Sequence, residues 1–149
     1  MRRVGPDSGN VGENLTVLKA HWLGRKAERV VRIGPGLVDQ FVALSGDSSP
    51  IHVSVEAARA RGFDGRVVHG MLLGALLSEV IGTELPGADG VLQNVELAFR
   101  HPCSIGDEIT ICVSVADFHE SVNTLVLKVS IRRKDGATLV SGTVRSGLR

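Results

Sequence analysis

Asp47 and His52 are two side chains that could perform acid–base chemistry together, and they stand five positions apart. On a continuous helix they would lie about 140° apart around the axis and could not cooperate. Pro50 disfavours helix at Ser49, so we expect a turned loop that brings the carboxylate and the imidazole to one spot. There the pair could exchange a proton with a bound water or substrate. A capping aspartate beside a surface histidine is the competing interpretation of the pair taken alone.

A second candidate site lies where an apolar helix is predicted to begin, at His69 and Gly70. The first N–H groups of a helix lack intrahelical acceptors and lie at the positive end of its dipole. Because Gly70 lets a ligand approach the backbone closely, its N–H could stabilise a developing oxyanion, such as the oxygen of a thioester enolate. The alternative is that both residues only start the helix. Ser78, inside the helix, either bonds back to a carbonyl one turn earlier or offers its hydroxyl to the site.

Composition excludes several classes of function. The 149 residues are 43% hydrophobic, which suits one domain with a full core. The net charge is +1 without a block of like charge, and aromatic residues are few, so we expect no nucleic-acid partner. The longest apolar segment, residues 71–81, is far shorter than the roughly 20 residues that cross a bilayer. No signal-peptide pattern follows Met1, and we expect a cytoplasmic protein without membrane contact.

The two cysteines, Cys103 and Cys112, show no C-x-x-C pattern. A disulfide framework or a structural zinc site is therefore not expected. The spacing and the expected compartment indicate two buried thiols.

The chain before the candidate loop predicts a tail, a strand and a helix. Residues 1–14 are polar and without periodicity, which indicates a flexible tail, and residues 15–149 then form a single domain. Residues 29–33 are β-branched and end at a glycine–proline turn, which predicts a strand. Apolar residues recur at helical spacing over residues 37–44, and Gly46 is expected to end that helix.

Two more helices are predicted around the candidate site. Ser54 is the expected N-cap of a short helix that Gly62 ends. Residues 70–82 are apolar around nearly the whole circumference of a helix, interrupted by Ser78 and Glu79. Such a helix is expected to be buried on all sides.

After residue 87 the hydrophobic period changes to two, which predicts four strands with one apolar face. The runs are residues 91–99, 109–115, 125–131 and 139–144, with a turn signal at residues 134–136. Strands of this kind form an antiparallel sheet with one buried face. We therefore expect an α+β fold in which a curved antiparallel sheet wraps around the central apolar helix.

Four motifs together resemble the MaoC-like (R)-specific enoyl-CoA hydratases. They are Asp-Ser-Ser-Pro-Ile-His at 47–52, Val-His-Gly-Met-Leu at 68–72, Ile-Gly-Thr-Glu-Leu-Pro-Gly at 81–87 and Ile-Gly-Asp-Glu-Ile-Thr at 105–110. The resemblance covers roughly residues 29–145. It implies the hot-dog fold, as a dimer or a double hot dog, and the addition of water to trans-2-enoyl thioesters to give (R)-3-hydroxyacyl thioesters. It implies no metal or redox cofactor, since coenzyme A or acyl carrier protein is part of the substrate.

The resemblance also implies roles for the candidate residues. Asp47 and His52 would be the catalytic pair that binds and activates water. The N–H of Gly70 would hold the thioester oxygen, with His69 in the same oxyanion and substrate-binding region. Ser78 falls where the family can have a site serine. Which member of the pair moves which proton is left open.

The chain departs from the family pattern at two positions. Ser49 stands where asparagine usually precedes the proline, and Ser54 stands where an acidic residue often follows the histidine. Serine can make a similar turn hydrogen bond, but its side chain has one hydrogen-bonding group fewer than that of asparagine. The loop geometry can therefore differ. Neither change removes a catalytic group.

Two other functions fit the same fold. A hot-dog acyl-CoA thioesterase would need a carboxylate on the central helix, for which Glu79 is the candidate. A non-catalytic partner subunit of a hetero-oligomeric dehydratase would typically lack the catalytic pair, which is present here. A sheet wrapped around one helix also leaves an edge strand exposed, and pairing of edges would give a homodimer. The sequence leaves open the acyl chain length, the choice between coenzyme A and carrier protein, and the physiological direction. Fatty-acid metabolism, polyester supply and lipid synthesis all fit.

Overall fold

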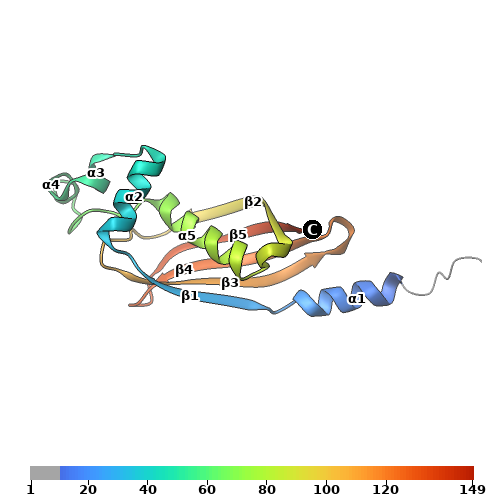
Figure 1. Cartoon of the computed structure of the whole chain (residues 1–149). Helices are drawn as coiled ribbons and strands as arrows, with labels where there is room; N and C mark the ends of the chain where they lie inside the picture. The colour runs from blue at the N-terminus through green and yellow to red at the C-terminus, as the bar shows by residue number, and fades with distance from the viewer. Residues whose placement is uncertain (1–10) are drawn as a thin grey trace, which may run out of the picture.

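The computed structural model describes residues 11–149. Its first element is helix α1, Val11–Trp22, which extends away from the end of the sheet (Figure 1). Residues 11–14, assigned above to a flexible tail, are therefore helical, and the rest of that tail lies outside the described residues. The sequence did not predict this helix: Trp22 at its end is buried in the core, whereas Val17 and Leu18 are exposed.

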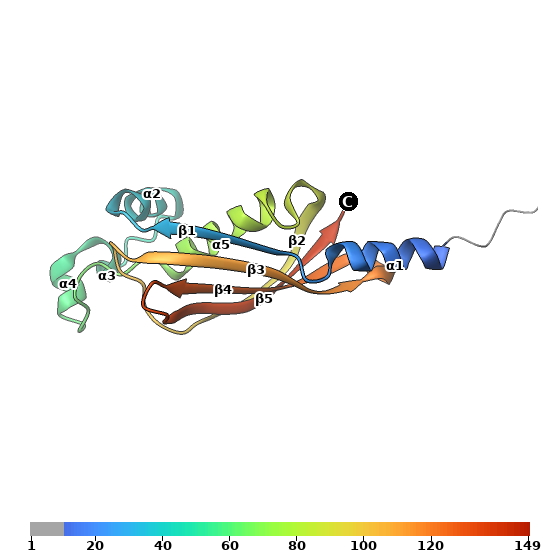
Figure 2. The ribbon, with the colours of Figure 1, turned by 90° about the horizontal axis from the view of Figure 1, so that it is seen from below.

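Five antiparallel strands form one sheet in the order β1-β3-β4-β5-β2. The strands are β1 Lys26–Arg32, β2 Gly90–Phe99, β3 Glu108–His119, β4 Thr124–Arg133 and β5 Thr138–Leu148. The predicted strands are all present, and β5 runs four residues beyond the predicted end at Val144. Figure 2 shows the sheet curving beneath helix α5, so the expected α+β architecture is confirmed.

The core lies between helix α5, Gly70–Thr83, and the concave face of the sheet. Alternate residues of the central strands face this helix because side chains of a strand alternate between the two faces. Directly paired examples are Ile111 with Ile131 and Val113 with Val129, all of them buried. Each such aliphatic side chain contributes roughly 1.5–3 kcal/mol by burial.

Helix α5 is not buried on all sides, which corrects the expectation from its composition. The sheet covers one side, where Leu73, Leu77 and Val80 are buried, whereas Met71 is 64% exposed. Strand β2 beside it is an edge strand with a register shift between Leu92 and Asn94, and it is exposed along most of its length. The predicted apolar face of β2 is therefore uncovered within one chain.

Three short helices gather at the end of the sheet where α5 begins (Figure 1). They are α2 Pro35–Ser45, α3 Pro50–Val53 and α4 Val55–Arg59. Gly46 ends α2 as predicted, with a φ of 76° that favours glycine and an N–H that donates to Val42. Ser54 caps α4 by accepting from the Ala57 N–H. This arrangement places the loop between α2 and α3 beside the first turn of α5.

Two short 3₁₀ helices, η1 Gly87–Asp89 and η2 Glu120–Val122, complete the elements of the described chain. Within residues 11–149, none of the helices has the length and apolar character needed to span a membrane.

Candidate active site

The loop between α2 and α3 brings Asp47 and His52 together. One ligand-type atom from each of Asp47, His52 and His69 lies within 4.8 Å of the others. The carboxylate is exposed, His52 is half-buried and His69 is buried. A carboxylate and two imidazoles therefore converge where the pocket described below meets the loop.

Backbone hydrogen bonds hold Asp47 in place. Its Oδ1 accepts from the Ser49 N–H at 3.2 Å, and its own N–H donates to Ser45 Oγ at 3.1 Å. The turn bond uses the backbone of Ser49, whose side chain makes no capping bond. Serine in place of the family's asparagine therefore leaves the Asp47 turn intact.

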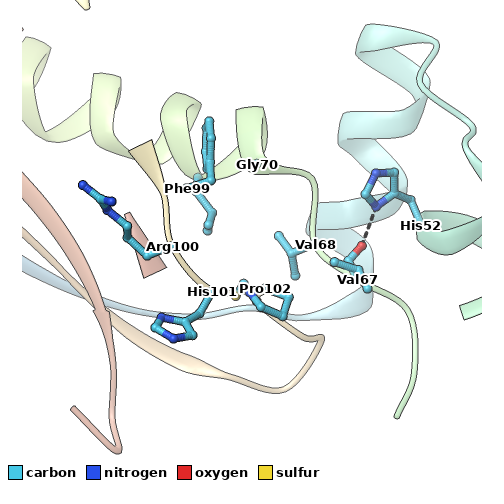
Figure 3. Close-up of a pocket in the computed structure, with 10 residues that line it drawn as sticks. His52, Val67, Val68, Gly70, Phe99, Arg100, His101 and Pro102 are labelled. Carbon is cyan, nitrogen blue, oxygen red and sulfur yellow. Dashed lines mark hydrogen bonds between the residues drawn. The ribbon is translucent and has the colours of Figure 1, made fainter. Parts of the chain in front are cut away.

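The tautomer of the neutral His52 ring follows from one contact. Its Nδ1 lies 2.7 Å from the carbonyl oxygen of Val67, drawn as the dashed line in Figure 3. A carbonyl oxygen can only accept, so Nδ1 carries the hydrogen and the neutral ring leaves Nε2 as a lone pair. His52 thus presents a basic nitrogen.

The segment before α5 clamps the same loop. Arg66 Nε donates to the His52 carbonyl at 2.6 Å, while its guanidinium binds Asp39 of α2 at 2.5 Å. The Val67 N–H donates to the Ile51 carbonyl at 2.9 Å. Sequence reasoning missed Arg66 and Val67, because Val67 acts through its backbone and Arg66 reaches a residue fourteen positions away.

His69 lies beneath the loop rather than in the pocket. Its ring is 2% exposed and stacks on that of His52, with centroids 3.8 Å apart and planes at 25°. Its Nε2 lies 2.9 Å from the Asp47 carbonyl oxygen, and its Nδ1 is buried without a partner among the described residues. The buried His69 side chain does not line the pocket, so it is not positioned to contact a substrate there directly.

The three clustered side chains are poorly arranged for a metal ion. Imidazole lone pairs lie in the ring planes, and metal ligands at about 2 Å must point at one centre. The rings of His52 and His69 are stacked, with centroids 3.8 Å apart and planes at 25°, so one ion could hardly lie in both ring planes at bonding distance. The geometry suits a hydrogen-bonded acid–base site better than a coordination site.

A pocket of about 400 Å³ opens beside this cluster. His52 and Gly70 both line it, and apolar side chains form most of the remaining wall. Figure 3 shows His52 on one side of the pocket and Arg100 on the other. The lining residues are His52, Val67, Val68, Gly70, Leu73, Phe99, Arg100, His101, Pro102 and Cys103.

Gly70 is the first residue of α5, so its N–H has no acceptor within the helix. A Cβ at this position would lie 2.9 Å from Cε1 of Phe99, which is closer than side chains normally pack. Glycine therefore lets the Phe99 ring pack against the start of α5, at a residue that lines the pocket. A developing negative charge on a substrate oxygen could be stabilised there.

Two residues of α5 singled out in the sequence lie away from this site. Ser78 is eight residues from Gly70, about 12 Å along the helix axis, and it is exposed and does not line the pocket. Glu79 forms an ion pair with Arg29 of β1, which also pairs with Glu84. These two carboxylates raise the pKa of Arg29, chiefly through the hydrogen bond that its guanidinium donates to Glu84.

The cysteines are both free, but only Cys103 is buried and Cys112 is half-buried. Burial, followed by the charge of Asp107, raises the pKa of Cys103 to about 12. Although Cys103 lines the pocket, its thiol stays protonated at neutral pH and is a poor nucleophile. Covalent catalysis by this residue is therefore not supported.

The chain is similar to several known proteins. The (R)-specific enoyl-CoA hydratase of Aeromonas caviae is 36% identical over 120 residues, covering 80% of this chain and 90% of that protein. The solved structure of the A. caviae (R)-hydratase, described as involved in PHA biosynthesis, superimposes with a TM-score of 0.82 over 85% of this chain and 96% of that one. The structure of an unliganded R-hydratase from Pseudomonas aeruginosa is 30% identical in sequence. It superimposes with a TM-score of 0.80 over 85% of this chain and 81% of that one.

The family model described as "MaoC like domain" matches residues 19–135, which is most of the chain. The match includes both Asp47 and His52 as well as the start of α5. The chain belongs to the MaoC-like domain family.

Proposed function

We propose that this protein is a hydro-lyase that adds water reversibly to trans-2-enoyl thioesters to give (R)-3-hydroxyacyl thioesters. One observation carries the proposal: the Asp47 carboxylate lies within 4.8 Å of an imidazole nitrogen of His52, and His52 lines a pocket that Gly70, the first residue of α5, also lines. The site thus offers a base for water and a donor for an oxyanion. The relatives named for this reaction support it.

The reaction begins with the thioester carbonyl accepting a hydrogen bond from the Gly70 N–H. This bond draws electron density out of the double bond and makes the β-carbon electrophilic. Water held by Asp47 and His52 gives its oxygen to the β-carbon while His52 Nε2 takes a proton. The enolate then regains a proton at the α-carbon from the pair, so the sum is the addition of one water.

The pocket suits a thioester whose handle points out to solvent. Its wall near Leu73 and Phe99 is apolar and can contact the acyl chain. Arg100, on the opposite side from His52, offers a positive charge toward the handle. The mechanism draws on the side chains of Asp47 and His52, the backbone N–H of Gly70 and the substrate, whose handle is coenzyme A or acyl carrier protein.

A homodimer through strand β2 is part of the proposal. Strand β1, the other edge, carries four charged residues in seven, which opposes pairing with a second sheet. Strand β2 carries only one charge, at Glu96, and exposes several large apolar side chains. The register with β5 places three of these exposed side chains, Leu92, Val95 and Phe99, on the same face of β2, and Met71 of α5 is exposed as well. A second copy that pairs its own β2 would cover this face.

The test is hydration of crotonyl-CoA by the purified protein, followed as loss of the enoyl absorbance. The product should be the (R)-3-hydroxyacyl thioester, which an (S)-specific 3-hydroxyacyl-CoA dehydrogenase leaves unoxidised. Butyryl-CoA, assayed in parallel for released thiol, tests the thioesterase alternative. If crotonyl-CoA and longer enoyl-CoAs all stay unchanged, the proposal fails and the partner-subunit alternative gains.

A further inference from the structure

We propose that His69 is a positioning residue, which holds Asp47 through its backbone carbonyl and His52 through ring stacking. The inference rests on the proposed function, because it assigns His69 to the same acid–base site. The residue sits at the N-cap of α5 and is 2% exposed, although Asp47 above it is exposed. It therefore connects the rigid central helix to the catalytic loop.

The hydrogen bond to Asp47 fixes both the loop and the tautomer of His69. The two residues are twenty-two positions apart, and Nε2 lies 2.9 Å from the Asp47 carbonyl oxygen. Since that oxygen can only accept, the hydrogen of neutral His69 is on Nε2. The bond restrains the backbone at the residue whose carboxylate must meet the water.

The stacking contact restrains the other catalytic side chain. The His52 and His69 rings lie face to face at 3.8 Å, and the His52 Nδ1 is bound to Val67. Rotation of the His52 ring would break both contacts, so the direction of its Nε2 lone pair is fixed. Phe41 of α2 also packs on the His69 ring, with centroids 5.0 Å apart. His69 is thus held firmly enough to act as a support.

Because the Nδ1 of His69 has no partner within residues 11–149, we infer that the imidazole is retained for the hydrogen bond that its Nε2–H donates to Asp47. A buried polar atom without a partner is unfavourable and rare in native proteins. An apolar side chain of similar size would avoid that cost and still pack against Phe41 and His52. Such a side chain could not donate to Asp47, which is the one thing that the imidazole adds.

Two amide substitutions separate the hydrogen bond from the ring. In His69→Gln the amide nitrogen can take the place of Nε2, whereas in His69→Asn it takes the place of Nδ1. Both lose the aromatic ring, so the difference between them reports on the bond to Asp47. We expect kcat of the Asn variant to be about tenfold or more below that of the Gln variant, with KM values within about threefold. His119→Asn, at an exposed histidine, is the control and should match the wild type.

The outcomes separate this proposal from the proposed function. If the wild type hydrates crotonyl-CoA and the Gln and Asn variants have equal kcat, the positioning role is wrong. If the wild type is inert on enoyl-CoAs, the proposed function fails instead. Long-range ¹H–¹⁵N NMR of the imidazoles tests His69 without activity and without variants that must fold. A hydrogen on Nε2 of His69 and on Nδ1 of His52 supports the proposal, and a hydrogen on Nδ1 of His69 overturns it.

Discussion

The Nδ1 atom of His52 lies 2.7 Å from the carbonyl oxygen of Val67, and this contact decides which ring nitrogen is free for chemistry. Val67 is held in turn by its N–H bond to Ile51 and by a bridge to Ser104. The basic nitrogen of the site is therefore set by backbone groups that are themselves anchored to the sheet region. A ring fixed in this way needs no reorganisation when water binds.

Gly70→Ala should lower kcat/KM for an enoyl-CoA by about 10- to 100-fold. The added Cβ would lie 2.9 Å from Cε1 of Phe99, so the ring or the start of α5 would have to move at the wall of the pocket. Gly82→Ala on the same helix is the matched control, since nothing lies within 4 Å of its Cβ. The control should keep full activity and gain roughly 0.5–1 kcal/mol of stability. Equal activity of the two variants would remove Gly70 from the proposed oxyanion site.

Val95→Glu should convert the proposed homodimer to a monomer at micromolar concentration. Val95 is 49% exposed on β2, and a charge there opposes pairing of two β2 edges. Val30→Glu, at a residue 64% exposed on β1, is the matched control and should leave the dimer intact. Light scattering coupled to gel filtration distinguishes the two edges. A dimer lost only with Val30→Glu would place the interface on β1.

Glu79→Gln should leave hydration unchanged. The carboxylate is paired with Arg29 and lies outside the pocket, so its loss removes only an exposed ion pair. Initial rates on crotonyl-CoA at saturating and limiting concentrations check this. A large loss of activity, or thiol release that depends on Glu79, would favour the thioesterase chemistry.

Cys103 should react with a water-soluble maleimide at pH 8 only after unfolding. Burial raises its pKa to about 12, against 9.0 for an unperturbed thiol, so the native protein has almost no thiolate. Between those values the unfolded chain loses a proton that the native chain keeps, so stability should fall as pH rises through this range. Labelling of Cys112→Ser in native buffer and in denaturant measures the difference. Fast labelling of the native variant would contradict the buried, protonated state.

Period-two alternation predicted the strands because one face of β3, β4 and β5 is buried in the same chain. The exposure of β2 and of one side of α5 could not be predicted from this pattern, because Val95 and Met71 read as core residues whichever chain covers them. Helix α1 was also missed: its Val17 and Leu18 are exposed, whereas Trp22 at its end is buried.

The candidate pair could be identified from residue types and spacing, whereas its supports could not. Val67 contributes a carbonyl oxygen that every residue possesses, so its side chain carries no signal. The burial of His69 depends on how α5 meets the loop, and a histidine before a helix is equally compatible with an exposed cap. These contacts join positions 15 to 22 residues apart and exist only once the chain has folded.

Asp47 and His52 are proposed to activate water together. The most direct test of this role is the rate at which the Asp47→Asn and His52→Ala variants hydrate crotonyl-CoA. The exposed residues Asp64 and His119 supply controls of the same chemical type, as Asp64→Asn and His119→Ala. We predict that both site variants lose about 100-fold or more of kcat, as removal of an acid–base group does, and that both controls match the wild type. An active wild type whose two site variants retain its rate would contradict the assignment of the catalytic pair.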